Sequence, residues 1–403
     1  MALTKEEQLA LINENLAEVL NPEIIEDVLN KGETLKIYWG TATTGAPHCG
    51  YFVPIMKIAQ LLKAGANVKI LLADVHAFLD NLKAPIELVE YRAKYYRFAI
   101  TALLKACNVP VEKLEFVLGS SYQLSAKYTM DTYRACSITS THDCAKAGSE
   151  VVKQSDNPPL SGLIYPILQA LDEEYLDVHC QFGGVDQRKI FALAKDLLPK
   201  LGYSGRAHIM NPIVQSLSGG KMSSSDANSK IDLLDTPEIV GRKVKKANAP
   251  PKQVEDNGLL AFTEHVLLPA SSLLDEERLF KVEQKEGEPL VYRDIESMKK
   301  DYAADVLTPQ LLKPAVTAAL CRLLAPIQKE YQESTEWQEV RYHTAAFCLP
   351  RRRPEGKKKK KDKGTRHPGA RAQAEEGKDV SKEPATEADV GKSAADAMDK
   401  LAV

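Results

Sequence analysis

Short apolar runs alternate with longer amphipathic segments through the first half of the chain. Runs with the length and composition of buried β-strands cover residues 35–39, 68–73 and 114–118. Segments with apolar residues at helical spacing cover residues 51–63, 85–106 and 190–198. This alternation predicts a parallel sheet covered by helices. Ligands on such sheets bind beyond the carboxyl ends of the strands, where the strand order reverses.

The pattern changes twice further along the chain. From about residue 232 it predicts helices joined by long polar connections, which indicates a second, mainly helical domain. Residues 351–371 hold eleven Lys or Arg and only two acids, while residues 372–403 are rich in Ala, Glu and Asp and contain no aromatic residue. Neither stretch can bury enough apolar surface to offset its chain entropy, so we expect both to be disordered.

Composition excludes several classes of protein. The chain of 403 residues is 44% apolar and carries a formal net charge of −2, which argues against a wholly basic nucleic-acid-coating protein. Its seven cysteines form no CxxC pair and no zinc-like spacing, so we expect no metal site and a reducing compartment. The N-terminal sequence lacks the apolar region of a secretion signal, and no apolar run approaches the roughly 20 residues of a membrane helix. These features predict a cytoplasmic protein without a membrane partner.

A turn rich in Gly and Thr, at residues 40–51, is the first candidate site. It follows a predicted strand and opens a predicted helix. Small residues let the backbone approach a phosphate, and free amides at a helix start favour an anion. His48 lies at that start, and Gly50 leaves room for a flat base. Taken alone, an ordinary strand–helix turn explains the segment equally well.

A second candidate is the Gly/Ser segment 218–225, in which Lys221 is the cation. A mobile loop that carries one lysine can close over a triphosphate. Taken alone, a solvated surface loop is the simpler interpretation.

Three polar residues share one face of a predicted helix that is otherwise apolar. Tyr165, Gln169 and Asp172 are spaced by four and then three residues. Because apolar residues lie between them, we expect the helix to be buried and its polar groups to need partners. A bound amino acid with an ammonium group and a phenol would supply them. The alternative is a solvated polar stripe.

A fourth candidate, residues 182–189, has the sequence Phe-Gly-Gly-Val-Asp-Gln-Arg-Lys. Paired glycines after a strand permit close approach of a ligand. Asp186 can accept hydrogen bonds from ribose hydroxyls, and Arg188 and Lys189 begin a helix that could meet nucleic-acid phosphates. A tight turn before a solvated charged helix is the alternative.

Together these segments resemble the class I aminoacyl-tRNA synthetases. The His-Cys-Gly-Tyr of residues 48–51 is similar to the HIGH signature, and residues 221–225 are similar to the KMSKS signature. Three further matches narrow the resemblance to the archaeal and eukaryotic tyrosyl-tRNA synthetases, with a short tail like that of fungal forms. These matches are Tyr-Trp-Gly at 38–40, Tyr-Pro-x-x-Gln-x-x-Asp at 165–172 and Gly-Gly-x-Asp-Gln-Arg-Lys at 183–189.

The resemblance implies a role for each matching residue. Tyr38 and Asp172 would hold the phenol oxygen of L-tyrosine, while its ammonium end would be held by Tyr165, Gln169 and Gln187. His48 and Lys221 would be catalytic and stabilise the pentavalent α-phosphate. The implied ATP-binding residues are Gly40, Thr41, Gly45, His48, Gly50, Gly184, Asp186, Lys221, Met222, Ser223 and Ser224. The residues considered for tRNA binding are Arg188, Lys189, Lys357, Lys358, Lys359, Lys360 and Lys361.

The implied fold is of the α/β class and has three parts. A Rossmann-type parallel-sheet catalytic domain would span 1–231, with a dimer-forming insertion at about 110–165. A helical anticodon-binding domain would span 232–345, and a disordered tail, Lys-rich and then acidic, 346–403. The implied reaction attaches L-tyrosine to tRNA(Tyr) through a tyrosyl-adenylate. It would be carried out in the cytoplasm by a homodimer, with ATP as substrate accompanied by Mg²⁺ and no tightly bound cofactor.

Several departures from the family pattern leave alternatives open. Ser224 occupies the position of the second KMSKS lysine, and Leu311 stands where an aspartate usually reads the first anticodon base. A tryptophanyl-tRNA synthetase is the nearest alternative enzyme, and a catalytically silent RNA-binding paralogue is the alternative from another class. The basic run at 241–246 suggests a nuclear pool, although a solvated helix face near tRNA is the simpler interpretation.

Overall fold

Five parallel strands and one antiparallel edge strand form the central sheet of this computed structural model, which describes residues 3–80, 86–152, 159–214, 230–275 and 277–348. The strand order is β1-β6-β5-β2-β3-β4. The strands are β1 (Glu18–Leu20), β2 (Lys36–Ala42), β3 (Asn67–Ala73), β4 (Leu114–Leu118), β5 (Cys180–Gly184) and β6 (Ala207–Asn211). The predicted parallel α/β sheet is confirmed, and its predicted strands are β2, β3 and β4. The short antiparallel strand β1 was not predicted.

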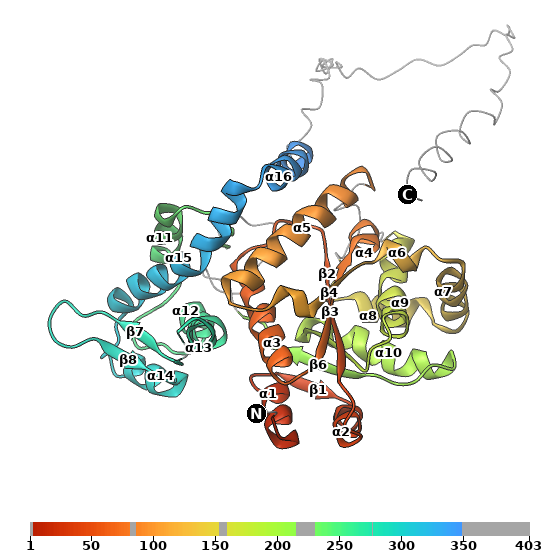
Figure 1. Cartoon of the computed structure of the whole chain (residues 1–403), viewed down its shortest axis with the longest axis horizontal. Coiled ribbons are helices and arrows are strands. Elements are labelled where there is room, and N and C mark those ends of the chain that lie inside the picture. The colour runs from red at the N-terminus through yellow and green to blue at the C-terminus, as the bar shows by residue number, and fades with distance from the viewer. Residues whose placement is uncertain (1–2, 81–85, 153–158, 215–229, 276, 349–403) are drawn as a thin grey trace, which may run out of the picture. The chain divides into compact units, whose positions relative to one another are not determined.

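Ten α-helices accompany this sheet in the described part of the first 214 residues. They are α1 (Lys5–Asn13), α2 (Pro22–Asn30), α3 (Phe52–Lys63), α4 (Asp74–Leu79), α5 (Ile86–Ala106), α6 (Ser120–Gln123), α7 (Ala126–Ile138), α8 (Thr141–Gly148), α9 (Leu160–Tyr175) and α10 (Arg188–Lys200). The predicted helices correspond to α3, α5 and α10. Figure 1 shows α3 and α5 on one side of the sheet and α9 and α10 on the other.

The strand order reverses beside β2. From β2 the chain builds outward through β3 and β4, and it then returns to place β5 and β6 on the opposite side. The adjacent register pairs Trp39 with Ile70 on one side and with Phe182 on the other. The carboxyl ends of β2 and β5 therefore form the switch point at which ligands bind in open α/β sheets.

Residues 237–348 are mainly helical, as predicted, but they include a small hairpin that was not predicted. The helices are α11 (Pro237–Lys245), α12 (Gly258–Phe262), α13 (Leu268–Leu274), α14 (Ile295–Ala303), α15 (Pro309–Glu333) and α16 (Thr335–Cys348). The hairpin pairs β7 (Phe280–Val282) with β8 (Leu290–Tyr292). Trp337 of α16 is fully buried, stacking on Phe98 of α5 and meeting the ring of Tyr331 edge-on. These aromatic contacts attach α16 to the sheet-covering helix α5.

One helix is longer and more apolar than the sequence analysis expected. By length and composition alone α15 could cross a membrane. However, it buries Leu312, Val316 and Leu320 in the hydrophobic core. Lys313 Nζ donates to the carbonyl oxygens of Lys245 and Ala247 at 2.9 Å. These contacts explain its apolar face as packing within the helical part of the fold.

Candidate functional site

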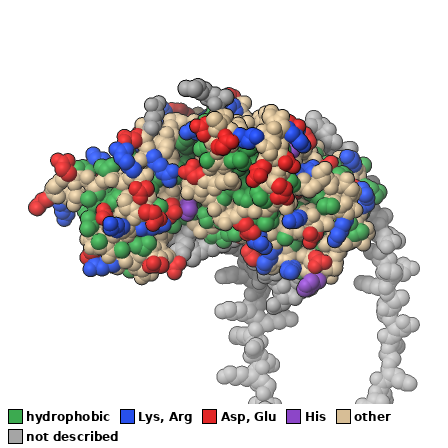
Figure 2. Space-filling view, turned by 90° about the horizontal axis from the view of Figure 1, so that it is seen from below, with side chains coloured by type: hydrophobic (Ala, Val, Ile, Leu, Met, Phe, Trp, Pro, Cys, Tyr) green, Lys and Arg blue, Asp and Glu red, His purple; other side chains and the backbone are tan. Residues whose placement is uncertain are grey.

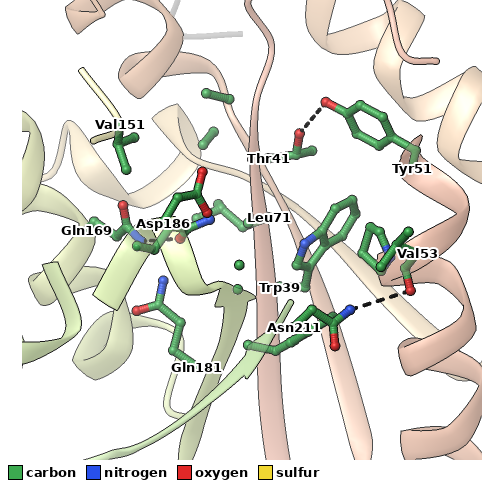
Figure 3. Close-up of a pocket in the computed structure, with 18 of the residues that line it drawn as sticks. Trp39, Thr41, Tyr51, Val53, Leu71, Val151, Gln169, Gln181, Asp186 and Asn211 are labelled. Atoms are coloured by element: carbon green, nitrogen blue, oxygen red, sulfur yellow. Dashed lines mark hydrogen bonds between the residues drawn. The ribbon is translucent and has the colours of Figure 1, made fainter. Parts of the chain in front are cut away.

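A cavity of about 360 Å³ opens at the carboxyl ends of β2 and β5. Eleven of the sequence-predicted site residues line it: Tyr38, Gly40, Thr41, His48, Gly50, Tyr165, Gln169, Asp172, Gly184, Asp186 and Gln187. Figure 3 shows Thr41, Gln169 and Asp186 around this cavity. The structure therefore brings together residues from three separate sequence segments at the predicted switch point.

Other predicted residues lie elsewhere. Gly45 does not line the cavity, and its amide donates to the hydroxyl of Tyr96 at 3.2 Å. Lys221, Met222, Ser223 and Ser224 lie outside the described residues, as do Lys357, Lys358, Lys359, Lys360 and Lys361.

The two basic residues at the start of α10 are engaged with acids. Arg188 forms a bidentate pair with Glu18 of β1, with donor–acceptor distances of 2.7 and 2.9 Å. Lys189 Nζ lies 2.8 Å from Glu150 Oε1 and donates to Ser149 Oγ at 2.9 Å. Both charges are therefore already paired with acids of this chain. Neither Arg188 nor Lys189 lines the cavity.

Among the lining residues that the sequence analysis missed, three have polar side chains suited to ligand binding: His76, Gln181 and Asn211. The sequence position of each residue relative to a strand could have indicated its role. His76 lies in the segment that directly follows β3, Gln181 is a polar residue inside an apolar strand, and Asn211 ends β6. Functional side chains gather at the carboxyl ends of central parallel strands, so His76 and Asn211 could have been nominated once the strands were assigned, and Gln181 by its polarity within an apolar strand.

Asp172 is one of the residues that line the cavity, and its side chain is fully buried. Its Oδ1 accepts hydrogen bonds from Tyr122 Oη, Gln123 Nε2 and Tyr128 Oη, each at 2.8 Å. Its Oδ2 has no hydrogen-bond partner among the described residues, and the nearest ion-pairing atom is His76 Nε2 at 3.8 Å. Burial raises the pKa of Asp172, while His76 and the three donors oppose that shift.

Amide and phenol groups lie beside this carboxylate. Gln169 Nε2 donates to Gln187 Oε1 at 2.7 Å, joining α9 to the turn after β5. Tyr38 Oη donates to the carbonyl oxygen of Gln169 at 3.3 Å, and burial raises the pKa of Tyr38, with Asp172 adding to the shift. The ring of Tyr165 meets His76 edge-on at 4.6 Å between centroids. This wall offers donors and acceptors suited to a small polar ligand.

The two glycines after β5 are required by close contacts. A Cβ on Gly183 would lie 2.8 Å from Phe191 Cζ, and one on Gly184 would lie 2.5 Å from Asp186 Oδ1. Real Cβ atoms almost never approach other atoms this closely. Glycine therefore allows Phe191 to pack in the core and the Asp186 carboxylate to lie beside the strand end.

His48 caps the short 3₁₀ helix η1 (Cys49–Tyr51), which leads into α3. Its Nδ1 accepts from the amide of Gly50 at 3.1 Å, which leaves Nε2 as the N–H in the neutral ring. Burial lowers the pKa of His48 from 6.5 to about 4, and the nearby charge of Lys230 adds to the shift. The imidazole is thus a neutral hydrogen-bond donor at physiological pH.

Residues 230–235 are bonded both to the turn that carries His48 and to helices of the helical part. His48 pairs with Asp232 in an antiparallel bridge, and the amide of Cys49 donates to the carbonyl of Ile231 at 2.9 Å. Three hydrogen bonds hold this chain from the helical side: Lys243 Nζ to Lys230 O at 2.9 Å, Lys243 Nζ to Asp235 Oδ2 at 2.6 Å, and Gln328 Nε2 to Asp235 O at 2.8 Å.

The fold and site define an α/β protein with a nucleotide-type switch-point cavity. Among its lining residues, the Asp172 carboxylate can accept a hydrogen bond from a small ligand, and His48 offers a neutral imidazole at a helix start suited to a phosphate. The comparisons with known proteins make this class specific. Residues 30–325 match the family described as "tRNA synthetases class I (W and Y)".

Individual relatives agree with this match. The chain is 53% identical over 370 residues to "Tyrosine--tRNA ligase, cytoplasmic" of Saccharomyces cerevisiae, covering 90% of this chain and 94% of that one. It is 54% identical to the enzyme of that name from Danio rerio over 84% of this chain, but it spans only 63% of that relative's length. The tyrosyl-tRNA synthetase of Archaeoglobus fulgidus, solved with L-tyrosine, superposes with a TM-score of 0.74 at 35% identity, covering 81% of this chain and 98% of that one. The chain belongs to the class I tRNA synthetase family for tryptophan and tyrosine, in its tyrosine–tRNA ligase branch.

The environment of His48 predicts its titration. Its native pKa of about 4 lies below its ordinary value of 6.5, so the unfolded chain binds more protons between these values. The stability contributed by His48 is therefore complete above pH 6.5 and is lost as the pH falls towards 4. We expect the His48 Cε1 resonance in an NMR titration to remain in its neutral form down to about pH 5. Lys230→Met should raise the midpoint, whereas a wild-type midpoint near 6.5 would contradict this assignment.

Proposed function

We propose that this chain is an enzyme that attaches L-tyrosine to tRNA(Tyr) using ATP. The observation that carries the proposal is the single cavity that joins the buried Asp172 carboxylate to the helix start at His48. The identity to tyrosine–tRNA ligases supports tyrosine as the amino acid. These relatives are named cytoplasmic, and we place this chain in the same compartment.

Activation would begin with attack of the tyrosine carboxylate on the α-phosphorus of ATP. A new P–O bond forms, the bond to the β-phosphate bridge breaks, and pyrophosphate leaves. A terminal ribose hydroxyl of the tRNA then attacks the adenylate carbonyl carbon and releases AMP. Both steps need positioning and charge stabilisation more than covalent chemistry from the protein.

The cavity suggests how the substrates lie. Asp172 Oδ2 would accept the phenol hydrogen of tyrosine, and Tyr38 would complete the phenol site. An indole could not do the same, because it offers a donor but no acceptor. Gln169 and Gln187 would face the ammonium end, and the α-phosphate would then reach His48, whose neutral Nε2–H can donate to it.

Two further groups would assist the phosphates. Lys221, which lies outside the described residues, would close on the triphosphate from the KMSKS-like segment. Mg²⁺ would enter with ATP and be held chiefly by phosphates and water. Within the described ranges, no group of three or more His, Cys, Asp or Glu residues could hold a metal ion.

Amino-acid-dependent pyrophosphate exchange tests the function. We expect exchange with tyrosine and not with tryptophan or phenylalanine. Asp172→Ala should lower kcat/KM for tyrosine roughly 10- to 150-fold, because it removes a charge-assisted hydrogen bond of about 1.5–3 kcal/mol. The matched control is Asp177→Ala, since that exposed carboxylate pairs with Lys36 away from the cavity.

Two outcomes would contradict this proposal. Exchange with tryptophan alone would indicate the other amino acid of the family, and exchange with no amino acid would indicate a silent RNA-binding paralogue. Full tyrosine activity in Asp172→Ala would remove the assigned role of that carboxylate while leaving the reaction in place.

We propose that the chain works as a homodimer through the segment 110–165. Its helix α7 exposes large apolar side chains: Met130 is 58% and Tyr133 is 64% exposed, and Leu124 just before the helix is 61% exposed. Clustered apolar side chains on a surface indicate a protein interface. The inner face of the same helix is buried instead, and it includes Tyr128 and Ala135.

Charge introduced on this surface should separate the subunits. We expect Met130→Glu with Tyr133→Glu to halve the mass measured by sedimentation equilibrium, because two buried carboxylates per subunit would oppose association. Tyr342→Glu is a matched control, since Tyr342 is 73% exposed but lies on α16. A wild-type monomer, or an unchanged dimer in the double variant, would contradict the proposed interface.

We propose the three-part division for tRNA binding: 1–231 for catalysis, 232–345 for the anticodon and 346–403 as a tail. Gln310 and Leu311 line a second cavity of about 690 Å³ between α13, β7 and α15. With Leu311 on its wall, this surface lacks the aspartate that the resemblance associates with anticodon reading. Figure 2 shows acidic and basic side chains mixed over one face of the described surface, so that face is not a continuous basic patch.

The Lys-rich run 357–361 would therefore strengthen tRNA binding without reading sequence. Each phosphate contact releases counterions, so deletion of 351–403 should weaken tRNA binding and flatten its dependence on salt. Tyrosine-dependent pyrophosphate exchange should persist, because the predicted active-site motifs all lie before the deletion. The measurement is tRNA affinity over a salt series for the full and truncated chains. Equal slopes and affinities would show that the run only solubilises the protein.

A further inference from the structure

The two oxygens of the Asp172 carboxylate have opposite environments. Oδ1 is surrounded by three donors at 2.8 Å, from Tyr122, Gln123 and Tyr128. Oδ2 is equally buried but has no hydrogen-bond partner among the described residues, and Asp172 is one of the residues that line the cavity. A buried carboxylate oxygen without a partner is costly, so this arrangement suits an oxygen whose partner is a ligand.

The three donors are themselves held in place. Tyr128 is 1% exposed, and its hydroxyl is also 2.8 Å from the carbonyl oxygen of Leu168, so its single hydrogen is shared between two acceptors. Tyr122 Oη has Asp172 as its hydrogen-bond partner, and its ring meets that of Tyr128 edge-on at 5.7 Å. Gln123 is buried and directs Nε2 to Asp172. Tyr122 and Gln123 are therefore the two complete donors.

This asymmetry fixes the rotation of the carboxylate. A partial turn of Asp172 about its Cβ–Cγ bond would move Oδ1 away from all three donors, whereas a half-turn only exchanges two equivalent oxygens, so the donors fix the plane of the carboxylate. The donors therefore fix the position of the second oxygen before any ligand arrives, and they stabilise the negative charge that burial disfavours. A preoriented acceptor binds a phenol hydroxyl without paying for reorganisation.

We infer that Tyr122, Gln123 and Tyr128 are positioning residues that determine selection of the phenol by orienting Asp172. This inference rests on the proposed function, and it assigns a role to side chains that lie behind the substrate-facing carboxylate. Phenylalanine would leave Oδ2 buried and unpaired, and that cost is largest when the oxygen cannot turn away. The three residues therefore act on discrimination between tyrosine and phenylalanine as well as on affinity.

The first test compares hydroxyl deletions within one aromatic cluster. Tyr122→Phe should raise KM for tyrosine roughly fivefold to tenfold in pyrophosphate exchange and change kcat less than about twofold, because it perturbs binding more than the phosphates. The ratio of kcat/KM for tyrosine over phenylalanine should fall by a similar factor. The control is Tyr175→Phe, whose ring stacks on Tyr122 but whose hydroxyl bonds to Asp131 Oδ2 at 2.7 Å. We expect the control to change KM less than about twofold.

The second test asks whether the effect passes through the carboxylate. In an Asp172→Asn background, adding Tyr122→Phe should change KM less than about twofold, because the oriented acceptor is already lost. A purely structural role would give the same increase in both backgrounds. Gln123→Met repeats both measurements with the other complete donor, which keeps the test decisive if one variant folds poorly.

The outcomes separate this inference from the function on which it rests. Equal effects of Tyr122→Phe and Tyr175→Phe, or an undiminished effect in the Asp172→Asn background, would overturn the positioning role. An unchanged tyrosine-to-phenylalanine ratio in both Tyr122→Phe and Gln123→Met would also overturn it. Absence of tyrosine-dependent exchange in the wild-type enzyme would instead refute the proposed function.

Discussion

The parallel pairing of β2 with β5 is the constraint on which the site depends. The two strands are remote in sequence, yet their register places Tyr38 beside Gln181 and Trp39 beside Phe182. Because β2 and β5 are parallel, their carboxyl ends lie at the same end of the sheet. The turn that carries His48 and the turn that carries Asp186 therefore both line one cavity. Helix α9 precedes β5 with only a short turn between them, and the polar face of α9 that includes Asp172 also lines this cavity. No local segment could create this cavity by itself.

Burying a carboxylate in this cavity creates a second requirement, which the segment 110–165 meets. The cost of desolvating Asp172 has to be offset by donors, and those donors come from α6 and α7. The same helix α7 that points Tyr128 inward presents Met130 and Tyr133 to the surface. The proposed dimer surface and the support for tyrosine selection are thus opposite faces of one helix, so packing changes at one face bear directly on the other.

Much of the fold and part of the site could be predicted from sequence, for local reasons. Apolar runs identified β2, β3 and β4, and three polar residues on an apolar helix identified Tyr165, Gln169 and Asp172. Three-residue strands such as β1 and β7 are too short to leave a periodic signal. The donors Tyr122, Gln123 and Tyr128 could not be found locally either, because their role exists only once α9 packs beside them. For the same reason, nothing in the sequence near Arg188 indicated that its charge would be paired with Glu18, which is remote in sequence.

The helical part also supports the catalytic end of the cavity. Asp235 receives Lys243 from α11 on its side chain and Gln328 from α15 on its carbonyl, and the chain it anchors runs directly into the bridge between Asp232 and His48. The pair of Lys243 with Asp235 is largely shielded from water, so it resists salt screening better than an exposed pair does. Residues 230–235, which follow the KMSKS-like segment in sequence, are therefore held between the HIGH-like turn and the helices proposed to bind tRNA. Displacement of α11 or α15 would reach His48 through this short series of hydrogen bonds, which gives the helical part a physical route to the phosphate chemistry.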